Sequence, residues 1–435
     1  MTMQTVRRLA VLLLLGLSAL SLEAVPVEIV EGSAVPENVE ARRLLQETIV
    51  APRSEVLSSR DEVIPQVIGA PEVRYEVRRQ NGHFYQLFTN REAETFALYN
   101  RGSYIIKRRM DDGAFVQVKI FYRSDPGFFL RIFPDGERSV LDLYVAGVRT
   151  YHKVLLPVDF GSVLVEPFAE IRRMTRGIIK WEQLYREVPP AAYDQVRSTV
   201  ETAREALPSL PDAEDGAMDA RGKLVFIESL VLQDQLPGFN CSGFAKWVAD
   251  GIYGPATGGY LEISALKEKH LELRGHQWSR LQEDERDPYF GLDWSRNLAR
   301  HLAALEPGGE KQPLPHPEEL DVRSVPFSRY VEDVGFPVEE ISRIAYFLAL
   351  EEPGHFYIAS LNREFGSEPV LRQHVHVAVI FPYFDGAGRF HVSVMERNVE
   401  TSLESLERRY AGDYIHLVRV RAREDFLAPR IVTED

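Results

Sequence analysis

The sequence predicts an α+β protein in which a β-rich antiparallel N-terminal domain precedes a second domain with its helices ahead of its sheet. Two patterns support this fold class. Short alternating apolar runs with glycine turns occupy residues 72–157, and helical periodicity gives way to strand-like runs after residue 351. The chain has 435 residues, 45% of them hydrophobic, which is enough for a sizeable core.

The first 24 residues have the order of a secretory signal peptide. Arg7 and Arg8 precede an apolar run from Leu9 to Leu20, and a short polar stretch ends at Ala24. We therefore expect export to the periplasm or cell envelope, with an uncleaved anchor as the alternative. No later apolar run reaches the roughly 20 residues of a membrane span, so we do not expect an integral membrane protein. The net charge of -14 argues against nucleic acid as a partner.

The β-rich domain is expected over residues 25–170. After a helix near residues 38–50, the runs SYIIKRR, AFVQVKIFY, FFLRIF, SVLDLYV and VRTYHKVLL are separated by turns such as MDDG and PDGE. In AFVQVKIFY, Val116, Val118 and Ile120 share one face, which is the period-two pattern of a half-buried strand. Closely spaced turns of this kind predict an antiparallel meander.

A helical linker and an acidic loop are expected over residues 171–222, followed by the second domain over 223–435 with an insertion at about 255–336. The insertion contains a helix that we expect Asp293 to cap, and a further helix is expected to begin at Pro337. Strands are predicted in HFYIASL, HVHVAVIFPYF, GRFHVSVMERN and YIHLVRVRA.

Cys241 is the single cysteine of the chain and lies in the segment PGFNCSGFAKWVADG. Asn240 is a good N-cap residue, and apolar side chains then repeat at helical spacing, so we expect Cys241 on the first turn of a helix. The free N–H groups and dipole of a helix start stabilise a thiolate and bind an oxyanion. Small Ser242 and Gly243 would let a substrate approach. The alternative is a buried, inert cysteine.

A histidine on a neighbouring strand would serve as the base for such a thiol, held by a third polar group. His374 and His376 lie two residues apart on one predicted strand, and we favour His376 as the base with His374 at the edge of the site. We expect His391 on the next strand to orient it. Glu396 and Asn398 are the alternatives in that role.

These segments together resemble the NlpC-type papain-like cysteine peptidases, which cut peptide bonds in cell-wall peptidoglycan. NCSGFAKWVADG is similar to the family's DCSGF helix start, EPGHFYIAS to its PGDLVFF strand, and HVAVIFPYF to its HVGIY strand. The resemblance implies a papain-like fold for the second domain, with Cys241 as nucleophile, His376 as base and His391 as orienting residue. It covers about half of residues 223–420 and none of the N-terminal domain.

The chain departs from the family pattern at three points. Asn240 and His355 stand where the family has aspartate, and about 100 residues separate the cysteine helix from the PGHFY strand. The extra segment would form a lid or a wall of the substrate site. We expect no cofactor. A zinc site built from the three histidines and Cys241 is the less favoured alternative, because no carboxylate lies at tight ligand spacing.

The function expected from these features is thiol-dependent hydrolysis of an amide bond, with a peptidoglycan stem peptide or cross-link, or another peptide, as substrate. A thiol acyltransferase would use the same residues. A non-catalytic binding or scaffold protein of the cell envelope that keeps the fold is the alternative from a different class, and the long insertion and altered aspartate positions motivate it.

Overall fold

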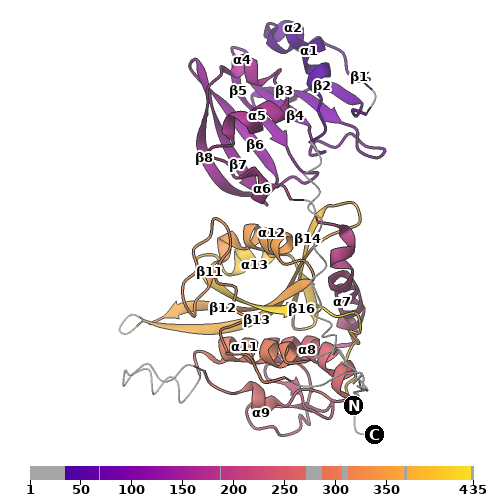
Figure 1. The fold of residues 1–435 in the computed structure, drawn as a ribbon, viewed down its shortest axis with the longest axis vertical. Helices are drawn as coiled ribbons and strands as arrows, with labels where there is room; N and C mark the ends of the chain where they lie inside the picture. Colours follow the sequence, from indigo (N-terminus) through magenta and orange to yellow (C-terminus); the bar gives the residue numbers. More distant parts are fainter. Residues whose placement is uncertain are drawn as a thin grey trace, which may run out of the picture.

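The computed structural model describes residues 35–67, 69–186, 188–270, 287–305, 312–366 and 370–432. The predicted signal segment, residues 1–24, lies outside these ranges. Within them, no helix is both long and apolar enough to cross a membrane. The described chain forms two sheet-containing parts, one above the other in Figure 1.

The N-terminal part contains an eight-stranded antiparallel sheet whose strands follow one another in chain order, so the predicted meander is confirmed. Two-residue turns such as Ala146–Gly147 connect neighbouring strands, and both residues have positive φ, which favours glycine at the second position. The strands are β1 (Glu62–Ile64), β2 (Val73–Gln80), β3 (His83–Asn90), β4 (Tyr104–Arg109), β5 (Phe115–Phe121), β6 (Phe129–Asp135), β7 (Arg138–Val145) and β8 (Val148–Leu156).

Short helices cover this sheet, and a buried arginine fastens the first of them. The Arg42 guanidinium stacks on Tyr104 at 3.7 Å and donates a hydrogen bond of 2.6 Å to the Leu164 carbonyl oxygen. Trp181, which follows the predicted limit at residue 170, packs edge-on against Tyr122. The helices are α1 (Val39–Leu44), α2 (Gln46–Val50), α3 (Arg53–Val56), α4 (Phe160–Val163), α5 (Phe168–Thr175) and α6 (Trp181–Leu184).

The second part is a six-stranded antiparallel sheet in the order β11-β16-β12-β13-β14-β15, with a separate pair β10-β9. The long strands confirm the four predicted runs. Their bounds are β9 (Ala217–Met218), β10 (Leu224–Val225), β11 (Phe336–Pro337), β12 (His355–Phe365), β13 (Leu371–Phe384), β14 (Phe390–Glu396), β15 (Val399–Thr401) and β16 (Tyr414–Arg421).

Helices lie on both faces of the second sheet (Figure 1). Alternate residues of β12 point to opposite faces of the sheet. Phe356 and Ile358 pack in one core with Trp247 of α8 and Trp294 of α11. Tyr357 and Ala359 pack in a second core, on the face that α12 covers. The helices are α7 (Asp194–Ala206), α8 (Cys241–Thr257), α9 (Ile263–Leu266), α11 (Phe290–Ala303), α12 (Ile341–Glu351) and α13 (Leu403–Arg409), with 3₁₀ turns η1 (Pro190–Tyr193), η2 (Leu207–Ser209) and η3 (Val338–Glu340).

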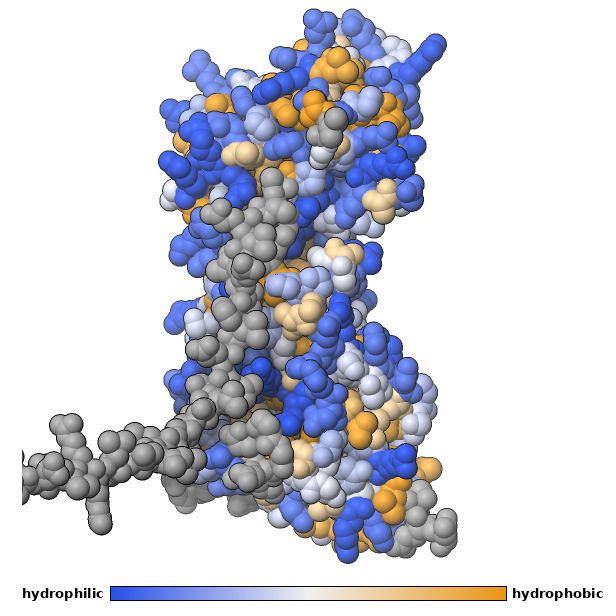
Figure 2. Space-filling model, turned by 45° about the vertical axis from the view of Figure 1, so that its right-hand side comes forward, coloured by the Kyte–Doolittle hydropathy of each residue, from blue (hydrophilic) through white to orange (hydrophobic). Residues whose placement is uncertain are grey.

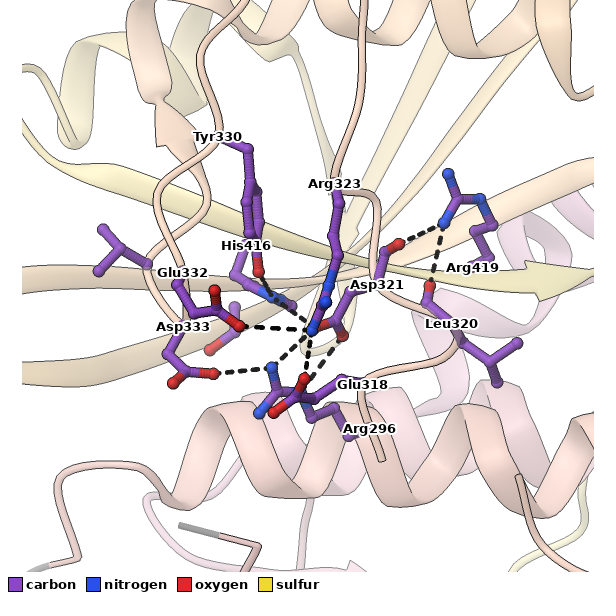
Figure 3. A network of polar contacts seen from close by, with 12 residues as sticks. Arg296, Glu318, Leu320, Asp321, Arg323, Tyr330, Glu332, Asp333, His416 and Arg419 are labelled. Carbon is purple, nitrogen blue, oxygen red and sulfur yellow. Dashed lines mark hydrogen bonds and ion pairs between the residues drawn. The ribbon is translucent and has the colours of Figure 1, made fainter. Parts of the chain in front are cut away.

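The segment predicted as an insertion is joined to the sheet by a buried polar network (Figure 3). Arg296 of α11 pairs with Asp321 at 2.7 Å and with Asp333 at 2.8 Å, and Asp321 lies 3.4 Å from His416 of β16. The prediction that Asp293 caps this helix is wrong. The helix begins at Phe290, one turn earlier, so Asp293 lies within its first turn.

The two parts contribute side chains to one hydrophobic core. Phe128 of the first part packs on Tyr346 of α12 with ring centroids 4.6 Å apart, and the Arg123 Nε donates a 2.6 Å hydrogen bond to the Tyr346 hydroxyl. Arg123 also stacks on Phe384. Hydrophilic residues dominate the face of the molecule in Figure 2, and hydrophobic residues form small separate groups on it.

Candidate active site

Cys241 is the first residue of α8, as the sequence predicts. Asn240 caps the helix in an extended conformation, and its Oδ1 accepts a 2.8 Å hydrogen bond from the Gly243 N–H. The Phe244 N–H bonds to the Asn240 carbonyl oxygen. Because the first N–H groups of a helix have no partner inside it, the start of α8 at Cys241 and Ser242 is an end of the helix that suits an anion, and both residues line the cleft.

Gly243 has a different role from the one predicted. It does not line the cleft beside Cys241, whereas Ser242 does. A Cβ atom at Gly243 would collide with the carbonyl oxygen of Gly216, so glycine lets the start of α8 pack tightly on the segment before β9. Gly243 thus positions the start of α8 against the segment before β9.

His376 and Glu396 form the polar pair next to the thiol. His376 lies on β13 and Glu396 ends β14, and the His376 Nε2 is 2.6 Å from the Glu396 Oε2. His376 and Cys241 line the same cleft, and they interact closely enough for each to shift the pKa of the other. Since Nε2 faces the carboxylate, Nδ1 is the ring nitrogen that remains for the thiol.

The prediction that His391 orients His376 is wrong. The β13–β14 register places His391 opposite Tyr383. The Nε2 of His391 lies 3.0 Å from the Asp385 carboxylate and not beside His376. Asn398, the second alternative, donates its side-chain amide to the Leu210 carbonyl oxygen at 3.1 Å. Glu396 is therefore the residue that the fold brings to His376.

The charges of the site favour a thiolate and an imidazolium. Burial raises the pKa of the Cys241 thiol, but the hydrogen bond and charge of His376, together with hydrogen bonds from the Val377 backbone and Ser242, outweigh burial and leave the pKa lowered. Burial lowers the pKa of His376, whereas the interactions with Cys241 and Glu396 raise it to about 9. Both shifts favour the ion pair of thiolate and imidazolium over the neutral pair.

Three residues that sequence reasoning missed hold Glu396 and His376 in place. Burial raises the pKa of Glu396, but hydrogen bonds from His376, Arg409 and Thr401 lower it to about 2. The Tyr410 ring stacks almost parallel to the His376 ring, with centroids 5.8 Å apart and an interplanar angle of 12°. Arg409 and Tyr410 lie at the end of α13, and no local motif marks them, because only the packing of α13 brings them here.

His374 lies at the edge of the cleft, as we expected. Its Nδ1 is 2.8 Å from the Ser360 hydroxyl and its Nε2 is 3.1 Å from the Asp333 carbonyl oxygen. Burial, together with the nearby His416, holds the pKa of His374 well below its usual range. Both nitrogens are thus engaged by the protein. Across the described ranges, no group of three or more histidine, cysteine, aspartate or glutamate side chains is placed to hold a metal ion.

The thiol opens into a cleft of about 820 Å³. Its walls come from the segment after η2, the starts of α8 and α11, β13 and the turn after β14. The lining includes charges of both signs, and two of its lysines are paired: Lys267 with Glu228 at 3.2 Å and Lys269 with Asp287 at 3.1 Å. The cleft is large and polar enough for an extended peptide-like segment.

The similarity to a known family lies in the first part of the chain. Residues 31–183 match the model of a family described as a domain of unknown function, DUF8515. The match spans the eight-stranded sheet and its helices and ends before Cys241. Neither the curated proteins nor the solved structures include a match to this chain.

Proposed function

We propose that the chain is a thiol-dependent amide hydrolase whose second part has a papain-like fold. The observation that carries the proposal is the Cys241 thiol at a helix start, in one cleft with His376, whose Nε2 lies 2.6 Å from the Glu396 carboxylate. A helix-borne cysteine packed against an antiparallel sheet with its histidine on β13 supports the papain-like assignment, as do the NCSGF and HVAVIF segments that resemble NlpC-type peptidases.

The proposed reaction has two halves. The Cys241 thiolate attacks the amide carbonyl carbon, and the N–H groups of Cys241 and Ser242 stabilise the oxyanion. The His376 imidazolium gives its proton to the leaving amine as the C–N bond breaks, which leaves a thioester. His376 then takes a proton from water, the hydroxide attacks the thioester, and the thiolate leaves with release of a carboxylic acid. Glu396 stabilises the imidazolium throughout.

The proposed substrate is a peptidoglycan stem peptide or cross-link. The motif resemblance and the predicted export signal support this choice, and a cleft of about 820 Å³ accommodates a peptide segment. Hydrolysis and acyl transfer share the thioester, so the acceptor decides between them. Free carboxylate in the product indicates water as the acceptor, and a new amide or ester indicates transfer.

The test compares full-length wild-type protein with the Cys241→Ser variant on isolated peptidoglycan. New amino groups are quantified and the released fragments are identified by mass spectrometry. We expect the wild type to release fragments with paired new amine and carboxylate ends, and the variant to release none. His391→Gln, which changes a histidine away from the thiol, is expected to behave like wild type. If wild type and Cys241→Ser release the same fragments, or if neither releases any, the peptidoglycan hydrolase proposal fails.

A further inference from the structure

A second cavity lies at the far end of the two helices that line the active-site cleft. Cys241 and Phe290, at the starts of α8 and α11, face the cleft, whereas Ile252 of α8 and the last turns of α11 face this cavity. Its volume is about 310 Å³, at the lower end of the range for small-molecule sites. The lining residues are Ile252, Ala299, Leu302, Ala303, Leu305, Leu320, His355, Arg419, Val420, Arg421 and Arg423.

The lining combines an apolar floor with a basic rim. Aliphatic side chains of α8 and α11, together with Leu320, form the floor. Three arginines and a histidine form the rim. The lining side chains include no acidic residue. The chain as a whole carries a net charge of -14, so a local basic rim of this kind stands out against its surroundings. His355, which stands where the resembled family has aspartate, belongs to this rim.

Two of the three arginines are neutralised by the protein. Arg419 binds both carboxylate oxygens of Glu352, at 2.7 and 2.8 Å, and turns toward the Leu320 carbonyl oxygen (Figure 3). The Arg423 Nε donates to Asp425 at 3.2 Å. These two arginines therefore shape the cavity wall and contribute little net charge.

Arg421 is the remaining cation. It lies opposite His355 in the β12–β16 register, its side chain is exposed, and no partner for its guanidinium occurs among the described residues. The His355 Nδ1 donates a hydrogen bond of 3.2 Å to the Glu352 carbonyl oxygen, and burial lowers the pKa of His355, so the cation available to an anion here is Arg421. Within the described part of the chain, a guanidinium without an ion-pair partner thus lines an apolar cavity.

We propose that this cavity binds a small amphipathic anion, namely a short apolar chain that ends in one carboxylate. The aliphatic floor takes the chain, and the Arg421 guanidinium takes the carboxylate oxygens. The site is separate from the proposed hydrolase site, and its existence does not depend on the reaction at Cys241.

Isothermal titration of the full-length protein with hexanoate, octanoate and decanoate tests the proposal. We expect saturable binding of one molecule per chain, tightening about fourfold for each added methylene until the cavity is full. Octanamide, octylamine and inorganic phosphate serve as comparison ligands, and each is expected to bind at least tenfold more weakly than octanoate. Equal binding of octylamine, equal binding of phosphate, or no saturable binding of any carboxylate would overturn the proposal.

Two variants locate the binding. Arg421→Gln is expected to weaken octanoate binding about tenfold, since the charged hydrogen bond is lost at a partly wet rim. Ala303→Trp fills the cavity from an exposed position on α11 and is expected to abolish binding. Arg60→Gln removes an exposed charge in the first part of the chain and should leave binding unchanged. Thermal unfolding shows that each variant is folded. Unchanged binding in folded Arg421→Gln and Ala303→Trp contradicts the assignment of this cavity.

Discussion

Replacing Glu396 with glutamine is expected to make the Cys241 thiol less reactive at neutral pH. The Glu396 carboxylate lies 2.6 Å from the His376 Nε2 and helps to raise the pKa of His376 to about 9. An adjacent opposite charge is worth about one to three pKa units, and each unit corresponds to about 1.4 kcal/mol. Without this charge the imidazolium is less stable, and the thiolate loses part of its counter-ion.

The rate of alkylation by iodoacetamide, followed as a function of pH, measures this effect without knowledge of the substrate. Cys241 is the single thiol of the chain, so the signal is unambiguous. In the wild type the reactivity midpoint should lie below the ordinary thiol pKa of about 8.5. In Glu396→Gln it should move upward by at least one pH unit, with alkylation at pH 7 slowed about tenfold.

The matched control for this experiment is Glu400→Gln. Glu400 is also a strand carboxylate, but its Oε1 accepts a 2.7 Å hydrogen bond from Ser393, and it pairs with Arg204 rather than with His376. Its variant should reproduce the wild-type profile. The reasoning is refuted if the Glu396→Gln profile superimposes on that of the wild type, or if Glu400→Gln shifts the midpoint equally.

Three further predictions concern the groups around the thiol. Tyr410→Leu removes the ring stacked on His376 and should slow Cys241 alkylation at pH 7 about two- to tenfold. Tyr410→Phe keeps the ring and should match the wild type. Equal alkylation rates in the two variants would contradict a role for the stacked ring. Gly243→Ala forces a methyl group against the Gly216 carbonyl and should cost about 1–3 kcal/mol in urea unfolding, so an unchanged unfolding midpoint would show that the contact relaxes freely. Because the pKa of Glu396 in the folded protein, about 2, lies below its value of 4.5 when unfolded, its ionisation stabilises the fold above pH 4.5, and that stabilisation is lost as the pH falls toward 2. The free energy of unfolding in urea should therefore fall more steeply between pH 5 and pH 3 for the wild type than for Glu396→Gln. Parallel pH dependences of the two proteins would contradict this role of Glu396.

The sequence was most informative where structure is determined locally. The meander of the first sheet follows from alternating apolar residues and glycine turns. The helix start at Cys241 follows from the capping residue Asn240 and the apolar repeat behind it. The docking of the two sheets through Arg123 and Tyr346 has no such local signal, because side chains more than 200 positions apart in the sequence create it.

The alternation of side chains along β14 gives the face of His391 but not its register with β13, and the register decides which residue reaches His376. Asp385 and Arg389 close the turn between the two strands, which places His391 opposite Tyr383 and puts Glu396 near the diagonal neighbour position of His376. This signal was present in the sequence. The contribution of Tyr410 was not, since α13 reaches the site only through packing against α12 and β14.

The absorbance of the thiolate near 240 nm, titrated with pH in the wild type and in Cys241→Ser, tests the central claim most directly. The difference between the two proteins reports Cys241 alone, because the chain has no other cysteine. An ion pair with His376 predicts half-titration below the ordinary thiol pKa of about 8.5, so that a thiolate band is already present at pH 7. A thiolate band that appears only at or above that pH would contradict an activated nucleophile at this site.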